Sequence, residues 1–355
     1  MDETNIRDQF TNLHQEIENV SRDLSMPKGK ESLCGFFKEC WISFKFVLSE
    51  KENLFFSFLQ LVAIAIGYYI WVQFLGWIPQ EVWDQIGNDK GGLFLNLIFL
   101  AWSFLCVGLV AYPIGILTAC MGASYTLHSE QRESTIPECL RMVADRSWPI
   151  WVFSWVDAWI TVNRILDRLP KKKDRTPLSV KIFKELVYQV WKTATLGIIP
   201  ALVYGRTVKE ACQDSLALLK TRLLRLGELR AAYSLICWIV GIGAYASLIV
   251  LFPYIMELQK AYQLPSIFMF YLFASIPMLL ALAVIMLIFR PLYIISATRI
   301  YINYADETQL ERRLPDVPSR GFAALIGFAG LIILVVLIML FRDQLGITSI
   351  LQNNL

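Results

Sequence analysis

The chain has 355 residues, of which 56% are hydrophobic, and it carries a net charge of +3 at pH 7. This composition excludes an ordinary soluble protein, because soluble domains contain about 45–50% apolar residues. The apolar residues also gather into runs long enough to cross a hydrocarbon layer roughly 30 Å thick. We therefore expect an all-α, polytopic helical membrane protein with about five transmembrane helices. The first 50 residues are polar and charged, so we expect no cleavable signal peptide.

Residues 1–25 predict an N-terminal helix with a hydrophobic seam. The seam follows the spacing of positions a and d in a coiled coil. Its residues are Ile6, Phe10, Leu13, Ile17, Val20 and Leu24. The other positions are rich in acidic and amide residues, so anionic lipid should repel this helix. Two interpretations stay open: a short coiled coil that joins protomers or binds a partner, and an amphipathic helix docked on the protein's own cytoplasmic region.

Residues 26–52 predict a linker and an interfacial helix, and residues 53–125 a first membrane hairpin with spans at about 54–78 and 93–120. The second span carries small residues at spacings of three and four. Such stripes let helix backbones approach closely within lipid. This one consists of Gly108, Ala111, Gly115, Ala119 and Gly122. We expect it to contact another part of the same chain, and a second protomer is the alternative.

Residues 126–230 predict a cytoplasmic and interfacial helical insert. Thr135 with Glu138, and Thr207 with Glu210, match the capping box that opens a helix. Each pair therefore predicts the start of a helix within the insert.

The apolar segment 147–169 of the insert has tryptophans along one helical face. They are Trp148, Trp151, Trp155 and Trp159. Tryptophan prefers the headgroup level, and a charge such as Asp157 is costly at the centre of a span. We interpret this segment as a helix that lies in the interface or against the cytoplasmic ends of the spans, where the tryptophans act as anchors.

A second apolar segment, 186–205, contains Lys192 and Pro200 and suits a re-entrant or buried piece better than a full span. A basic run lies between the two segments: Lys171, Lys172, Lys173 and Arg175. If both segments crossed the membrane, this run would lie outside, against the positive-inside rule. Five spans are therefore favoured over seven. The run itself is a candidate contact for anionic lipid, or it serves only to set the topology.

Residues 231–304 predict a second membrane hairpin, with spans at about 231–252 and 266–289. It repeats the first hairpin, because Leu54 and Ala231 lie 177 positions apart, and Pro113 and Pro291 lie 178 positions apart. Both copies enter from the same side, so the repeat is parallel.

Residues 305–355 predict a cytoplasmic loop, a fifth transmembrane helix at about 321–341 and a short tail. This span has its own small-residue stripe, formed by Ala323, Gly327 and Gly330. We expect it to support helix packing as the first stripe does.

The distribution of basic residues predicts the orientation. All but three of the 33 Lys and Arg residues lie in 1–52, 126–230 and 290–320. Basic segments stay on the cytoplasmic side. We therefore expect an integral membrane protein with the N-terminus in the cytoplasm and the C-terminus outside.

No catalytic, nucleotide-binding or metal-binding motif stands out. His14 and His128 lack the partners that a metal site needs, and the seven cysteines form no CxxC pair. We expect no cofactor, no nucleic acid and no catalytic activity. The spans also lack the ionisable groups that an ion-coupled carrier usually requires.

Three stretches carry a family resemblance: Lys45 to Asn53, Pro113 to Ser124, and the run from Gly197 through Pro200, Thr207 and Glu210 to Ser215. The pattern over most of 40–300 resembles bacterial multi-pass membrane proteins of unknown function. The resemblance implies a location in a bacterial inner membrane and this architecture, and it supplies no catalytic residues.

These observations favour a non-catalytic membrane scaffold or an accessory subunit of a membrane protein assembly. Its expected partners are membrane lipid and either further copies of itself or other membrane proteins. The alternative is a channel-like or lipid-handling transport protein. An enzyme of lipid metabolism ranks third, because it would need an acid, base or metal cluster that the sequence does not offer.

Overall fold

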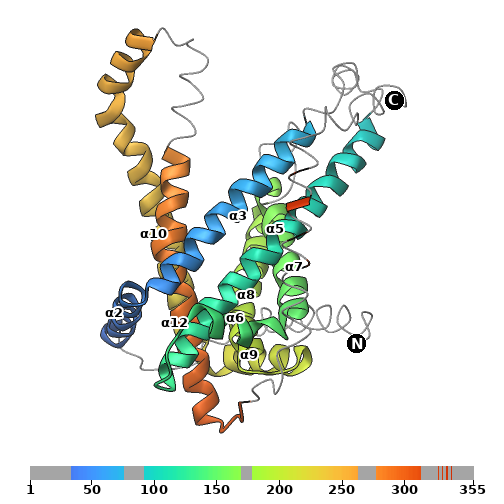
Figure 1. Cartoon of the computed structure of the whole chain (residues 1–355), viewed down its shortest axis with the longest axis vertical. Coiled ribbons are helices and arrows are strands. Elements are labelled where there is room, and N and C mark those ends of the chain that lie inside the picture. Colours follow the sequence, from blue (N-terminus) through green and yellow to red (C-terminus); the bar gives the residue numbers. More distant parts are fainter. Residues whose placement is uncertain are drawn as a thin grey trace. The chain divides into compact units, whose positions relative to one another are not determined.

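The computed structural model describes residues 33–75, 92–168, 178–262 and 277–312, and five single residues between 327 and 337. All regular secondary structure in these residues is helical (Figure 1). In chain order the elements are α2 (Leu33–Ser49), α3 (Lys51–Leu75), α5 (Gly92–Ser129), α6 (Ile136–Ala144), α7 (Ser147–Arg168), α8 (Leu178–Ala194), the 3₁₀ turn η1 (Thr195–Gly197), α9 (Ile198–Val203), α10 (Val208–Tyr262), a helical stretch at 277–284, the π-helical turn η2 (Ile285–Phe289) and α12 (Arg290–Glu307). The all-α architecture predicted from the sequence is confirmed.

Five stretches of the described residues are long and apolar enough to cross a membrane. They are Lys51–Trp71, Leu100–Ser129, Lys184–Val203, Val208–Val250 and Pro277–Glu307. All except Lys184–Val203 overlap spans expected from the sequence, which confirms a polytopic helical protein. The expected fifth span, 321–341, lies outside the described residues apart from single positions. Four of the five spans predicted from the sequence therefore correspond to apolar helical stretches in the structure.

The stretch Lys184–Val203 is the one expected as a re-entrant or buried piece. It qualifies by length and composition, yet it is not one straight helix, because η1 separates α8 from α9. Gly197 lets this turn approach α10 closely, because an added Cβ would lie 2.8 Å from Oγ of Ser215. The Ser215 hydroxyl also donates a hydrogen bond to the carbonyl of Ala194, the last residue of α8. Contact with α10 thus fixes the chain where α8 ends.

Thr207 opens α10 with the capping box predicted from the sequence. Its backbone N–H donates to Oε2 of Glu210 over 2.8 Å, and the Glu210 N–H donates to Oγ1 of Thr207 over 3.4 Å. The turn before it needs Gly205, whose φ of 91° suits a residue without Cβ. The other predicted box stands where α6 begins, at Ile136 directly after Thr135.

The helix α10 differs from its prediction in two ways. It joins the helix whose start was predicted at Thr207 and the span predicted at 231–252 into one element, broken only at Arg222, whose φ of −124° and ψ of 27° are not helical. It also continues through Pro253 to Tyr262, although 253–264 was predicted as the turn between spans. A proline inside a helix can kink it without ending it.

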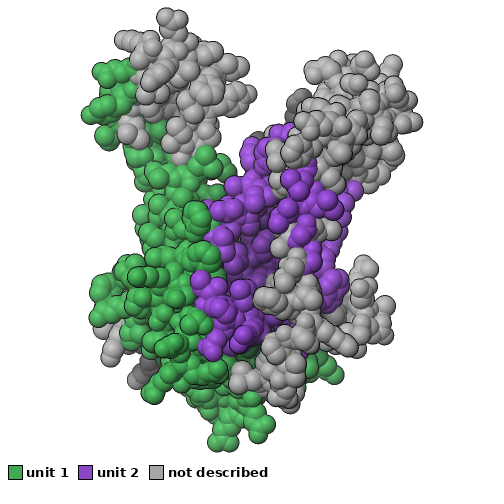
Figure 2. Space-filling view, in the orientation of Figure 1, with its two compact units in different colours: residues 1–58, 121–135, 177–313 green, residues 59–120, 136–176, 314–355 purple. Residues whose placement is uncertain are grey.

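The chain divides into two compact units, coloured separately in Figure 2. Unit 1 comprises 1–58, 121–135 and 177–313, and unit 2 comprises 59–120, 136–176 and 314–355. In unit 1, α2 packs on α12 through Phe46, Val47 and Ile295. In unit 2, α3 and α5 meet at Ile70 and Cys106. Each unit therefore has a hydrophobic core of its own.

Candidate functional site

The predicted tryptophan stripe lies in unit 2, where it packs on α5. Nε1 of Trp151 donates to the carbonyl of Gly108 over 2.8 Å, and Nε1 of Trp155 donates to the carbonyl of Phe104 over 3.1 Å. The rings of Trp151 and Trp155 are stacked at 5.4 Å. The indoles thus satisfy their N–H groups on the backbone of α5, which gives the stripe a structural role. Contact of these tryptophans with lipid headgroups stays a prediction.

In unit 2, α7 packs against the first small-residue stripe, which lies on α5. A Cβ added at Gly108 would lie 2.5 Å from the ring of Trp155, and one at Gly115 would lie 2.2 Å from Oγ of Ser154. Ala111 and Ala119 are also buried. Gly122 belongs to unit 1, where it lies near Thr298. These contacts are intramolecular, as expected, and at Gly108 and Gly115 the partner is the helix of the insert.

Gln60 of α3 links the two helices of the first hairpin. Its Nε2 donates to the carbonyl of Ile114 over 3.1 Å and to Oγ1 of Thr118 over 2.9 Å. Oε1 of Gln60 is buried and has no hydrogen-bond partner among the described residues. Hydrogen bonds between helices within a membrane contribute modestly, about 0.6–2 kcal/mol. This polar group is therefore used to join α3 to α5.

Asp214 forms a buried polar hub in unit 1 with two residues from other elements. Nε of Arg206 donates to Oδ2 of Asp214 over 2.8 Å, and the hydroxyl of Tyr301 on α12 donates to the same oxygen over 3.2 Å. The Arg206 and Asp214 side chains are 13% and 12% exposed. Burial lowers the pKa of the Arg206 guanidinium, but the hydrogen bond and charge of Asp214 outweigh it, so its net pKa is raised. The hub ties the turn before α10 to α12.

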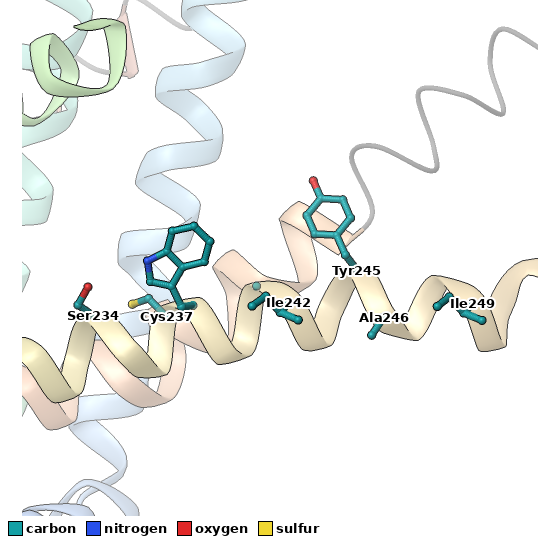
Figure 3. A pocket seen from close by; sticks show the side chains of 8 residues that line it. Ser234, Cys237, Ile242, Tyr245, Ala246 and Ile249 are labelled. Carbon is teal, nitrogen blue, oxygen red and sulfur yellow. The ribbon is translucent and has the colours of Figure 1, made fainter. Parts of the chain in front are cut away.

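A groove lies on α10 of unit 1 where this helix meets α8. The first part of the groove has a volume of about 520 Å³, and Gln189, Thr193, Arg230 and Ser234 are among the residues that line it. Nε of Arg230 donates to Oε1 of Gln189 over 3.4 Å. The second part has a volume of about 620 Å³, shares Ser234 and Trp238 with the first, and its described lining residues all belong to α10. Figure 3 shows Ser234, Cys237, Ile242, Tyr245 and Ile249 following one another along this helix.

Sequence reasoning missed both the hub and the groove. Asp214 and Tyr301 are 87 positions apart, and Gln189 and Arg230 are 41 positions apart, so no local pattern joins them. A signal was present for Arg230, because it is the last charged residue before the apolar run that begins at Ala231.

Most of the remaining predicted site residues fall outside the described part of the chain. The heptad seam from Ile6 to Leu24 and the basic run from Lys171 to Arg175 lie there, as does Ala323. Gly327 and Gly330 are described, and no described heavy atom lies within 4 Å of an added Cβ at either residue. The five cysteines whose side chains are described form no disulfide bond.

No group of three or more metal-ligating side chains occurs in the described ranges. Comparison with known proteins found no matching family model, no matching curated protein and no matching solved structure. The family resemblance proposed from the sequence therefore stays a prediction.

Proposed function

We propose that this chain is a non-catalytic integral membrane protein that acts as a scaffold or an accessory subunit of a membrane protein assembly. The observation that supports this proposal most directly is how the polar side chains near and within the spans are used. Gln60 joins α3 to α5, the stripe tryptophans bond the backbone of α5, and Asp214 joins Arg206 to α12. These groups hold helices of the same unit together.

The membrane part of α10 supplies a surface for assembly. Ile239, Val250 and Phe252 are large apolar side chains that are exposed in the described structure. Gly243 lies among them, and no described heavy atom lies within 4 Å of its added Cβ. Helices associate in lipid by close backbone approach at small residues. This face of α10 therefore suits the approach of a helix from another protein or from a second copy.

The predicted heptad seam offers a direct test. The full chain is purified from membranes in mild detergent as the wild type, as Leu13→Asp and as Asn12→Asp, and the protein mass in each particle is measured by light scattering. Leu13 lies on the seam and Asn12 beside it, so the two variants introduce the same charge at matched positions. We expect Leu13→Asp alone to reduce the assembly toward the 40.7 kDa of a single chain.

A single-chain mass in all three samples would contradict the scaffold proposal as applied to this seam. The second candidate function, a channel-like or lipid-handling transport protein, is favoured by the groove on α10. Liposomes that contain only the purified protein would distinguish the two functions, because a scaffold gives no ion or lipid flux above that of empty liposomes.

A further inference from the structure

The groove on α10 changes in character along its length. Its first part brings the polar side chains of Gln189, Thr193 and Ser234 together with Arg230, the residue directly before the apolar run of α10. Its second part is apolar and follows the helix through Trp238 and Tyr245 to Ile249. Ser234 and Ile249 are fifteen residues apart, or about 22 Å along a helix at roughly 1.5 Å per residue. The distance from Ser234 to Ile249 is therefore longer than half the thickness of a hydrocarbon core, which is roughly 30 Å thick in total.

The polar end carries a positive charge whose described partners are neutral. Arg230 donates to Oε1 of Gln189 and to the hydroxyl of Tyr293, and Tyr188 and Tyr233 lie nearby. The carboxylate of Glu185 accepts from Nε2 of Gln189 over 2.7 Å. Glu185 thereby orients the amide, so that the carbonyl of Gln189 faces the guanidinium. A guanidinium has five N–H donors, so Arg230 retains donors for a further acceptor.

A second positive charge lies near Tyr233, next to Arg230, although it does not line the groove itself. The guanidinium of Arg290 lies close enough to Tyr233 to influence its hydroxyl, as that of Arg230 does. Phosphate groups suit such a place, because guanidinium groups bind them through paired hydrogen bonds. The hydroxyl of Ser234, which lines both parts of the groove one helical turn after Arg230, is a further donor.

The apolar end is open. Trp238 and Ile249 are 67% and 79% exposed. Gly241 lies between them in the lining, and no described heavy atom lies within 4 Å of its added Cβ. The groove therefore combines a cationic end at the membrane boundary with a hydrocarbon-compatible track that enters the membrane.

We propose that this groove binds a phospholipid with an anionic headgroup, with its phosphate at Arg230 and Ser234 and an acyl chain over Gly241 between Trp238 and Tyr245. Charge complementarity decides between a lipid and a protein helix. A helix from another protein would have to bring its own carboxylate to Arg230 at the membrane boundary, whereas an anionic lipid carries its phosphate at that depth. The site is separate from the proposed scaffold role and stands without it.

Native mass spectrometry of the full chain tests the proposal. The protein is released from mixed micelles that contain dioleoylphosphatidylglycerol or dioleoylphosphatidylcholine, and bound lipid is counted at each lipid concentration. We expect preferential retention of the anionic lipid. Arg230→Gln should weaken that binding about fivefold, which corresponds to roughly 1 kcal/mol for one basic residue near the membrane surface. The matched control Lys220→Gln removes a charge from an exposed position on the same helix and should change nothing.

A second pair of variants tests the apolar track independently. Gly241→Leu fills the groove, whereas Gly243→Leu makes the same change at an open glycine that does not line it. We expect only Gly241→Leu to weaken retention of phosphatidylglycerol. Because the acyl chain contributes to binding, 10 mM inorganic phosphate should not displace the lipid.

Three results would overturn the proposal. The first is equal retention of the two lipids, or unchanged binding in Arg230→Gln. The second is an equal loss in Gly241→Leu and Gly243→Leu, or displacement of the lipid by inorganic phosphate. The third is a change of oligomeric mass in Gly241→Leu without a change in bound lipid, which would assign the groove to a second protein helix.

Discussion

Replacing Asp214 with Asn tests whether the hub holds α10 to α12. The substitution keeps the shape of the side chain but removes the charge that faces Arg206 over 2.8 Å. Breaking a buried ion pair by removing one partner costs about 3–5 kcal/mol. The Arg206 and Asp214 side chains are 13% and 12% exposed, so solvent compensates part of this loss. An asparagine oxygen can still accept from Tyr301. We therefore expect Asp214→Asn to lower the free energy of unfolding by about 2–3 kcal/mol.

The assay is reversible unfolding of the detergent-solubilised full chain, followed by tryptophan fluorescence. Tyr301→Phe removes one hydrogen bond to the Asp214 carboxylate, over 3.2 Å, and should cost about 1.5 kcal/mol. Glu307→Gln is the matched control, because Glu307 pairs with Arg222 between the same two helices but is 60% exposed. An exposed pair contributes about 0–1 kcal/mol.

A double-mutant cycle isolates the interaction itself. In Arg206→Leu/Asp214→Asn no unpaired charge remains, so the double variant should lose at least about 1 kcal/mol less than the sum of the two single variants. Single costs that add within about 0.5 kcal/mol would refute the reasoning. A cost of Asp214→Asn no larger than that of Glu307→Gln would refute it as well.

Two further predictions concern the packing of α7 and the topology. Gly108→Ala should destabilise unit 2 by about 1–3 kcal/mol, because its Cβ would lie 2.5 Å from the Trp155 ring. The control Gly241→Ala, at an open position, should be neutral or stabilising by up to about 1 kcal/mol. Equal effects of the two variants in the same unfolding assay would count against the packing of α7 on α5. Lys172→Cys, in an otherwise cysteine-free chain, should react with a membrane-impermeant maleimide only after the membrane is opened, and labelling of intact cells would support seven spans instead of five.

The helices were predictable from the sequence where one local pattern determines them. The capping box of Thr207 and Glu210 forms as predicted, because its two hydrogen bonds join residues only three positions apart. The same holds for the helical face that carries Trp151 and Trp155. The spacing predicted that these tryptophans share a face, but it did not reveal that the face meets α5 at Gly108.

Helix ends and tertiary contacts were less predictable, because they depend on residues distant in sequence. The turn η1 forms where Gly197 meets Ser215, and nothing between 186 and 205 specifies that contact. The break of α10 at Arg222 accompanies an ion pair in which Nη2 of Arg222 donates to both carboxylate oxygens of Glu307, 85 positions away. Asp214 likewise reads as a solvated acid on an amphipathic helix until Arg206 and Tyr301 are placed around it.

The charges along α10 show why an external anion suits Arg230 better than it suits Arg222. Asp214 and Arg222 each have an oppositely charged partner within unit 1. At Arg230 the chain places the amide of Gln189 where a glutamate of the same length would have formed an ion pair. An amide orients the guanidinium without neutralising it. A glutamate would satisfy Arg230 internally and remove the electrostatic reason for a lipid phosphate to bind there.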